Sequence, residues 1–211
     1  MVAFTPMQDF RERKRRGEGI ASLTAYDYPT ARLLDEAGVD IILVGDSLGM
    51  VVLGYEDTTE VTLEEMVHHT RAAARGVKQA LIVADLPIHT YETAAEAVAN
   101  AQQLIAAGAE AVKLEGGLSH VAQIEALVRE GIPLLAHIGM LPQSVRQEGG
   151  YKLKGRTEAE AEALLRDARA VEQAGAFAVV LEIVAAETAR EITRALQIPT
   201  IGIGSGESCD G

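Results

Sequence analysis

The feature that most constrains the fold of this chain is a recurring segment, in which a helical stretch ends at a glycine and an apolar run follows. Four copies are DEAGVDIILVGDS (35–47), AAGAEAVKLEGG (106–117), REGIPLLAHIG (129–139) and QAGAFAVVLEIV (173–184). Their glycines are Gly38, Gly108, Gly131 and Gly175. Glycine in this place is typical of a helix that ends in the left-handed conformation. The apolar runs that follow predict parallel strands buried on both faces.

Counting these runs predicts seven strands, spaced about 30 residues apart. Their expected starts are near Ile20, Ile41, Leu81, Ala111, Leu134, Ala178 and Thr200. Helix starts are marked between them, because Thr62 with Glu65 and Thr157 with Glu160 fit the capping box. Strands and helices that alternate at this spacing form βαβ units. Two architectures contain such units, a doubly wound open sheet and a (β/α)₈ barrel.

The carboxyl ends of the predicted strands favour the barrel. Almost every strand ends in a polar residue: Asp27, Asp46 with Ser47, Asp85, Lys113 with Glu115, His137, Glu182 and Ser205. An open sheet gathers its ligands at one switch point, whereas a barrel builds its site from nearly all strand ends. We therefore expect one barrel domain over residues 1–211, with an N-terminal helical extension at 1–19. Seven of the eight βα units are recognisable, so we expect the last unit to be missing from this chain.

Charge and composition exclude several classes of partner. The 19 Lys and Arg against 31 Asp and Glu leave a net charge of −12, which disfavours nucleic acid and anionic membranes. The basic run at 11–16 is interpreted as the solvated face of a helix. Neither a leader-like start nor an apolar run of about 18 residues is present. With one cysteine, Cys209, these features predict a cytoplasmic protein.

Four acids at separate strand ends predict a metal site. Asp46, Asp85, Glu115 and Glu182 would be costly to bury together, and Lys113 is the one obvious cation among them. A hard divalent cation such as Mg²⁺, which takes oxygen ligands, would compensate these charges. A buried network of ion pairs remains the alternative.

Lys113 and His137 add two candidate substrate contacts. Lys113 and Glu115 are two residues apart on one strand, so both side chains point to the same face. The ammonium would suit an anionic substrate such as a carboxylate, or it would serve as a Schiff-base nucleophile if its pKa were depressed. The acids around it oppose that depression. His137 is either a hydrogen-bond partner of a substrate oxygen or a core residue, and His89 and His120 fit local hydrogen bonds in loops.

Several segments of the chain resemble those of a known family. The segments that carry the resemblance are TAYDYPTARLLDEAGVD, ILVGDSLGMVVLGYEDTTEVTLEEMVHHT, VADLP, AVKLEGG, HIGMLPQSV, GGYKLKGR, LEIV and IPTIGIGSGESCDG. They run in the same order from residue 24 to the end, and together they are similar to the ketopantoate hydroxymethyltransferase family. Thr59-Glu60, Leu141 and Ser205 depart from the residues usual in that family, and none of them carries a role there.

The resemblance implies a (β/α)₈ barrel of the phosphoenolpyruvate/pyruvate superfamily type, with Mg²⁺ as its cofactor. By position, the metal ligands fall on Asp46, Asp85 and Glu115, the keto acid contacts on Asp46, Ser47, Asp85, Lys113 and His137, and the proton acceptor on Glu182. The implied reaction belongs to pantothenate biosynthesis and moves a hydroxymethyl group from 5,10-methylenetetrahydrofolate to 3-methyl-2-oxobutanoate, through an enolate, giving 2-dehydropantoate. Family members are homo-oligomers, commonly decamers.

The chemistry of the residues agrees with this reaction. A 2-keto acid chelates Mg²⁺ through two oxygens, and Glu182, on another strand, is free to remove the C3 proton. Three alternatives stay open. They are another Mg²⁺-dependent enolate lyase or aldolase acting on a pyruvate-like acid, a Schiff-base aldolase using Lys113, and an inactive truncated barrel that acts as an assembly partner.

Overall fold

The computed structural model describes residues 6–211, and these residues form one parallel sheet. Its seven strands pair in chain order from first to last. They are β1 (Ser22–Thr24), β2 (Ile41–Val44), β3 (Leu81–Asp85), β4 (Ala111–Glu115), β5 (Leu134–Gly139), β6 (Ala178–Glu182) and β7 (Thr200–Ile203). This order of parallel strands, in a sheet that curls into a nearly closed barrel, confirms the predicted architecture.

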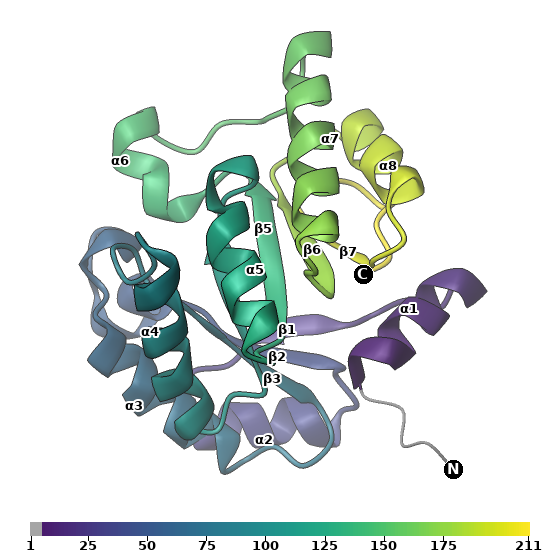
Figure 1. The fold of residues 1–211 in the computed structure, drawn as a ribbon. Coiled ribbons are helices and arrows are strands. Elements are labelled where there is room, and N and C mark those ends of the chain that lie inside the picture. Colours follow the sequence, from purple (N-terminus) through teal and green to yellow (C-terminus); the bar gives the residue numbers. More distant parts are fainter. Residues whose placement is uncertain (1–5) are drawn as a thin grey trace.

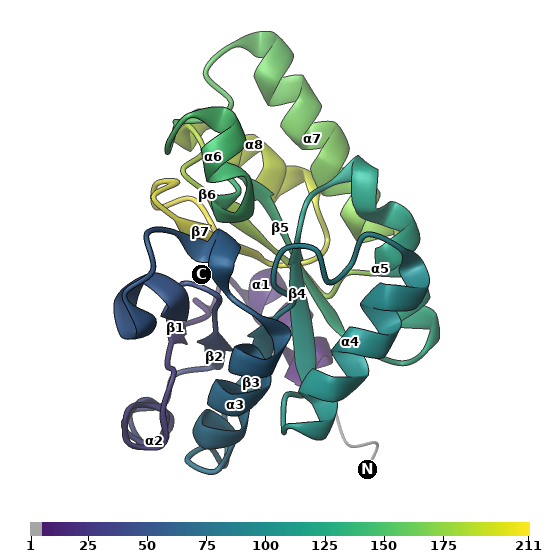
Figure 2. The ribbon, with the colours of Figure 1, turned by 90° about the vertical axis from the view of Figure 1, so that its left-hand side faces the viewer.

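The helices that follow the strands lie around the outside of the sheet (Figures 1 and 2). The helices are α1 (Pro6–Arg16), α2 (Tyr28–Glu36), α3 (Leu63–Ala74), α4 (Ala94–Ala106), α5 (Val121–Arg129), α6 (Val145–Glu148), α7 (Glu158–Gln173) and α8 (Ala186–Ala195). Short 3₁₀ and π turns lie in the loops at Gly49–Leu53, Thr58–Glu60, Leu118–His120 and Pro142–Ser144. Among residues 6–211, none of the helices is long and apolar enough to cross a membrane.

The local signals of the sequence are present in the structure. Six strands begin at the predicted residues, and β1 begins at Ser22, two residues after the expected Ile20. Both predicted capping boxes form, and a third joins Thr93 to Glu96 at the start of α4. The four glycines of the repeat all have positive φ, from 75° to 112°. They end the helices as glycine does in a left-handed cap.

Alternation along the strands separates an inner core from an outer one. On β3, Leu81 and Val83 belong to a cluster inside the barrel, whereas Ile82 and Ala84 pack in the cluster under the helices. Asp85 continues the inward series of Leu81 and Val83, because side chains two residues apart share a face. The same phase on β4, β5 and β6 takes Lys113, Glu115, His137 and Glu182 into the barrel mouth.

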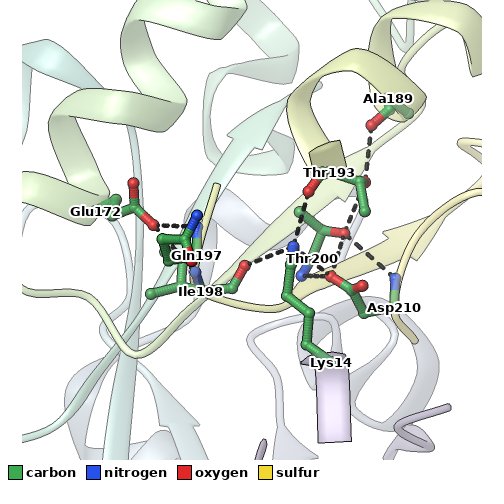
Figure 3. Close-up of polar contacts among 8 residues, drawn as sticks. All are labelled: Lys14, Glu172, Ala189, Thr193, Gln197, Ile198, Thr200 and Asp210. Atoms are coloured by element: carbon green, nitrogen blue, oxygen red, sulfur yellow. Dashed lines mark hydrogen bonds and ion pairs between the residues drawn. The ribbon is translucent and has the colours of Figure 1, made fainter. Parts of the chain in front are cut away.

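Helix α1 covers the amino end of the barrel. Phe10 is buried in the inner cluster, and its ring stacks on Phe177 at 6.5 Å between centroids. Lys14 Nζ donates to the carbonyls of Thr193 (2.8 Å) and Ile198 (3.0 Å) and to Asp210 Oδ2 (2.9 Å) (Figure 3). The interpretation of 11–16 as a solvated face was therefore wrong for Lys14. It was also wrong for Arg13, which pairs with Asp40, because α1 packs against the strand and loop ends at this side of the barrel.

The last residues of the chain lie between β7 and the segment that precedes β1. Ile20 N–H donates to Asp210 O (2.9 Å), and Gly202 N–H donates to Gly211 O (2.9 Å). Gly211 N–H in turn donates to Thr200 O (3.0 Å). These bonds link both edges of the sheet through residues 210–211.

Candidate active site

Strand ends β2 to β6 bring most of the predicted site residues together at the carboxyl end of the barrel. Sheet register places Asp85 beside Lys113 and Glu115 beside His137. The residues that meet here are Asp46, Asp85, Lys113, Glu115, His137 and Glu182, referred to below as the mouth cluster. All except Glu182, which is partly buried, are at least nine-tenths buried.

A hydrogen bond joins the backbone of Asp46 to the side chain of Asp85. Asp46 N–H donates to Asp85 Oδ2 at 3.1 Å, which fixes the turn after β2 against the end of β3. A Cβ at Gly45 would lie 2.9 Å from Ser47 Oγ and 3.5 Å from Asp85 Oδ2. Glycine at 45 therefore keeps space beside both groups. Ser47 itself is partly buried and its hydroxyl contacts Tyr26 Oη at 2.9 Å.

Lys113 supplies the positive charge of the mouth cluster. Its Nζ lies 3.0 Å from Asp85 Oδ1. Burial acts to lower the pKa of Lys113, but Asp85, Glu115 and Asp46 raise it by more, so the pKa lies above its ordinary value. The side chain is therefore a protonated ammonium, suited to binding an anion and poorly suited to Schiff-base formation.

Burial also shifts two of the carboxyl groups. The pKa of Asp46 is raised to about 7, first by burial and then by Asp85. The pKa of Glu115 is raised to about 8, again first by burial, although Lys113 acts in the opposite direction. Burial is the larger cause of both shifts, and the neighbouring acids add to it.

His137 lies between two acids. Its Nδ1 is 3.6 Å from Glu115 Oε1, and its Nε2 is 3.3 Å from Glu182 Oε2. Burial, followed by the charge of Lys113, lowers the pKa of His137, and Glu182 only partly offsets this. The imidazole is therefore neutral at pH 7. Neither ring nitrogen nor Glu115 Oε1 has a hydrogen-bond partner among the described residues, although all three atoms are buried.

Gln143 organises the mouth cluster, and our sequence reasoning did not find it. Its Nε2 donates to Asp46 Oδ2 (2.8 Å) and to Leu86 O (3.0 Å), while its backbone N–H donates to Glu115 Oε2 (3.0 Å). Its Oε1 accepts a hydrogen bond from Tyr91 Oη. One residue in a turn after β5 thus holds two acids and a tyrosine in place.

Ser205 shapes the strand end that presents Glu182. Its hydroxyl donates to Leu181 O (2.7 Å) and accepts from Val184 N–H (3.0 Å), on either side of Glu182. Between these bonds Ile183 has φ 48°, a conformation uncommon for a β-branched residue. The serine therefore stabilises a sharp turn directly after Glu182.

Some polar residues expected at strand ends do not join the mouth cluster. Asp27 is exposed and caps α2 by accepting from Thr30 N–H (2.8 Å). Its assignment to a strand end was wrong, because Asp27 lies three residues beyond the end of β1 and caps α2 instead. As expected, His89 and His120 make local hydrogen bonds, to Glu92 and Ser119 respectively.

The mouth cluster has the donor chemistry of an Mg²⁺ site. Among residues 6–211, no three His, Cys, Asp or Glu side chains converge tightly enough to surround a metal unaided. Mg²⁺ keeps several waters and usually takes one or two carboxylates directly, so a tight protein cage is not required. The unpartnered Glu115 Oε1 and the raised pKa values of Asp46 and Glu115 fit a site for a cation.

Comparison with known proteins identifies the family. The model of the ketopantoate hydroxymethyltransferase family matches residues 5–211. The chain belongs to this family. A 3-methyl-2-oxobutanoate hydroxymethyltransferase of Hyperthermus butylicus is 59% identical over 206 residues, covering 97% of this chain and 72% of that protein. The enzyme of the same name from Clostridium novyi is 55% identical, covering 96% of this chain and 74% of that protein.

Solved structures with this fold have lower sequence identity to the chain than these two enzymes have. A phosphonopyruvate hydrolase superposes with a TM-score of 0.69 at 16% identity, over 95% of this chain and 72% of that one. A 2,3-dimethylmalate lyase of the PEP mutase/isocitrate lyase superfamily gives 0.67 at 22% identity, over 94% and 72%. These matches confirm the barrel type expected from the sequence, and the family match makes the chain an enzyme of the hydroxymethyltransferase family.

Proposed function

We propose that this chain transfers a hydroxymethyl group from 5,10-methylenetetrahydrofolate to 3-methyl-2-oxobutanoate, giving 2-dehydropantoate. The observation that carries the proposal is the mouth cluster, which combines three buried carboxylates, a protonated lysine and a separate acid on β6. The family match supplies the reaction that this geometry suits. Phosphonopyruvate hydrolase, which shares the fold, is described as a complex with oxalate and Mg²⁺.

Asp46, Asp85 and Glu115 would hold Mg²⁺. They lie at neighbouring strand ends, and Gln143 orients two of them. When bound, the cation would polarise the ketone and offset the negative charge that develops on its oxygen. Lys113 would pair with the carboxylate of the keto acid, because its ammonium is the positive side chain of the mouth cluster.

Ser47 and His137 would contact the oxygens of the keto acid from either side of the acids. Ser47 offers a hydroxyl at the turn after β2. His137 offers a neutral ring whose nitrogens have no other hydrogen bond. A neutral imidazole with one N–H donates to an oxygen without adding charge to the site.

Glu182 would accept the C3 proton. Its carboxylate lies 3.3 Å from His137 Nε2 and is partly exposed, so solvent and substrate can reach it. Removing the proton leaves its electron pair on C3 as the enolate of the keto acid. A carbon–carbon bond then forms between C3 and the one-carbon unit, water supplies the hydroxyl oxygen, and tetrahydrofolate leaves.

Deuterium exchange at C3 of 3-methyl-2-oxobutanoate tests this proposal without folate. The acid is incubated with the protein in D₂O and followed by NMR, with Mg²⁺ and again with EDTA. We expect exchange that requires Mg²⁺. Exchange that survives EDTA would favour the Schiff-base alternative, and a cooperative thermal melt without any exchange would favour the inactive-barrel alternative.

The one-carbon donor separates this reaction from that of a related lyase or aldolase. We expect 2-dehydropantoate only when methylenetetrahydrofolate is added, and cleavage of a longer keto acid would contradict the transferase assignment. Assembly as a homo-oligomer remains a prediction. The family resemblance implies a decamer, and sedimentation analysis would test it. The cytoplasmic location likewise remains a prediction.

A further inference from the structure

A cavity of about 310 Å³ lies beside the mouth cluster. The loops that follow β3, β4 and β5 form its walls, through residues 88–92, 115–120 and 141–147. Glu115 and Gln143 belong to these walls, and Gln143 also holds Asp46 at 2.8 Å. A larger cavity of about 530 Å³ along α7 and α8 contains no residue of the mouth cluster.

The outer side of this cavity carries a carboxylate and an amide. Glu92 Oε1 lies 2.8 Å from His89 Nδ1, and Gln147 lies on α6 at the edge of the same cavity. His89 has φ 65°, which is uncommon for a residue other than glycine. Such backbone strain is typical of binding sites, where the surrounding structure holds a side chain in an unusual position.

Aromatic and apolar side chains complete the walls. The rings of Tyr91 and His120 contact each other edge to face, with centroids 5.3 Å apart. The His120 ring packs directly over Gly116, where an added Cβ would lie 2.2 Å from its Nδ1. Ile88 and Leu141 add aliphatic surface. The walls are therefore mixed, with two aromatic rings and two aliphatic side chains among polar groups that can fix the orientation of an organic ligand.

We propose that this cavity binds the reduced pterin ring of the one-carbon donor, an inference that rests on the proposed function. The donor must lie next to the bound keto acid, and Glu115 is common to the mouth cluster and the cavity. The 2-amino and N3–H groups of a pterin are adjacent donors, which match the acceptor oxygens of Glu92. The cavity has the volume for the bicyclic ring, and the rest of the folate extends out of it.

Two substitutions test the site against a matched control. Glu92→Gln removes the charged acceptor, Gln147→Leu removes the amide, and Glu125→Gln makes the same charge change on the exposed face of α5. For each variant, three quantities are measured: the KM for methylenetetrahydrofolate, the Kd of tetrahydrofolate by equilibrium dialysis, and C3 exchange of the keto acid in D₂O. A thermal melt reports the folded state.

Glu92→Gln is expected to raise both the KM and the Kd by roughly tenfold or more, as for a lost hydrogen bond to a charged group. Gln147→Leu should have a smaller effect in the same direction, and Glu125→Gln none. C3 exchange should stay at the wild-type rate in all three, because that half-reaction needs no folate. Its absence in the wild type would contradict the proposed function, whatever happens at the cavity.

Three results would overturn the cavity assignment itself. The first is a KM and Kd in Glu92→Gln and Gln147→Leu equal to those of the control. The second is a wild-type protein that exchanges C3 but binds no tetrahydrofolate. The third is a folded Glu92→Gln variant that loses C3 exchange, since Glu92 would then act on the keto acid.

Discussion

Two buried carboxylates at opposite ends of the barrel have opposite pKa shifts. Asp35 is 4% exposed, and its oxygens accept the backbone N–H groups of residues 78–80 at 2.8–3.1 Å. Burial raises its pKa, but the three donors outweigh burial, and the pKa lies below its ordinary value. Glu115 is 3% exposed and accepts one backbone N–H, from Gln143, so burial dominates and raises its pKa to about 8.

Two lysines show the same difference. Lys14 at the amino end has three oxygen acceptors within 3.0 Å, all provided by the chain itself (Figure 3). Lys113 at the carboxyl end lies within 3.0 Å of Asp85 and in the field of two further acids. The partly buried Lys14 therefore has more hydrogen-bond acceptors than the more deeply buried Lys113.

This difference in hydrogen bonding indicates that the amino end of the barrel stabilises the fold and that the carboxyl end binds a ligand. Buried polar groups stabilise a fold only when their hydrogen bonds are complete. The amino end meets this condition through Asp35 and Lys14. The carboxyl end leaves Glu115 and His137 with unpartnered atoms, which is the arrangement expected where a ligand supplies the missing partners.

Glu182→Gln should give the largest effect at the carboxyl end. The amide keeps the shape of the side chain but does not accept the C3 proton. C3 exchange should fall by roughly 10²–10⁴-fold, the usual contribution of a general base. Binding of the keto acid, measured by titration calorimetry with Mg²⁺ present, should be retained.

Glu187→Gln is the matched control, because Glu187 is an exposed acid at the start of α8, five residues along the chain. It should exchange C3 at the wild-type rate. Unchanged exchange in Glu182→Gln would remove Glu182 from its role as proton acceptor.

Lys14→Met should give the largest loss of stability at the amino end. It leaves Asp210 and two carbonyls without their shared donor. Hydrogen bonds to charged groups contribute about 1.5–3 kcal/mol, so the free energy of unfolding should fall by about 2–3 kcal/mol. Denaturant unfolding measures this, with the exposed Arg15→Met as control. C3 exchange of the folded variant should be unaffected, and a loss of exchange would break the separation between the two ends.

Gln143→Leu should weaken Mg²⁺ binding more than it weakens the fold. The substitution removes the donor to Asp46, while the backbone N–H to Glu115 remains. Loss of a group that orients a metal ligand typically costs about 10–100-fold in metal affinity. Calorimetric titration with Mg²⁺ tests this against Gln102→Leu on the exposed surface of α4. An unchanged affinity would contradict the placement of the metal on Asp46.

The sequence predicted the barrel because its signals are local. Each buried strand is a short apolar run, and the four helices of the repeat end at glycines whose positive φ needs no distant partner. The acids of the mouth cluster could be predicted in the same way, because the position of a strand also gives the position of the residue at its end. Asp27 failed this test because a helix cap and a strand end look alike in sequence.

Long-range partners account for what the sequence did not predict. Gln143 bonds to Asp46, 97 residues away, from a 3₁₀ turn with no periodic pattern. Lys14 and Asp210 are separated by 196 residues, so nothing near position 14 distinguishes it from the exposed Arg15. Such contacts depend on how the barrel closes.

Asp35→Asn should give the smallest of these effects, a loss of unfolding free energy that depends on pH. Because its folded-state pKa is lowered, Asp35 stabilises the fold above the unfolded pKa of about 3.9. That contribution is lost as the pH falls through the folded pKa. Asp35→Asn, which presents a single acceptor to the N–H groups of residues 78–80, should lower the free energy of unfolding by about 1 kcal/mol at pH 7. Denaturant unfolding at pH 7 and pH 3 should show this difference shrinking at the lower pH, with the exposed Glu36→Gln on the same helix as control. A difference that stays constant with pH would show that the three N–H donors do not hold Asp35 ionised, and the contrast with Glu115 would then rest on packing alone.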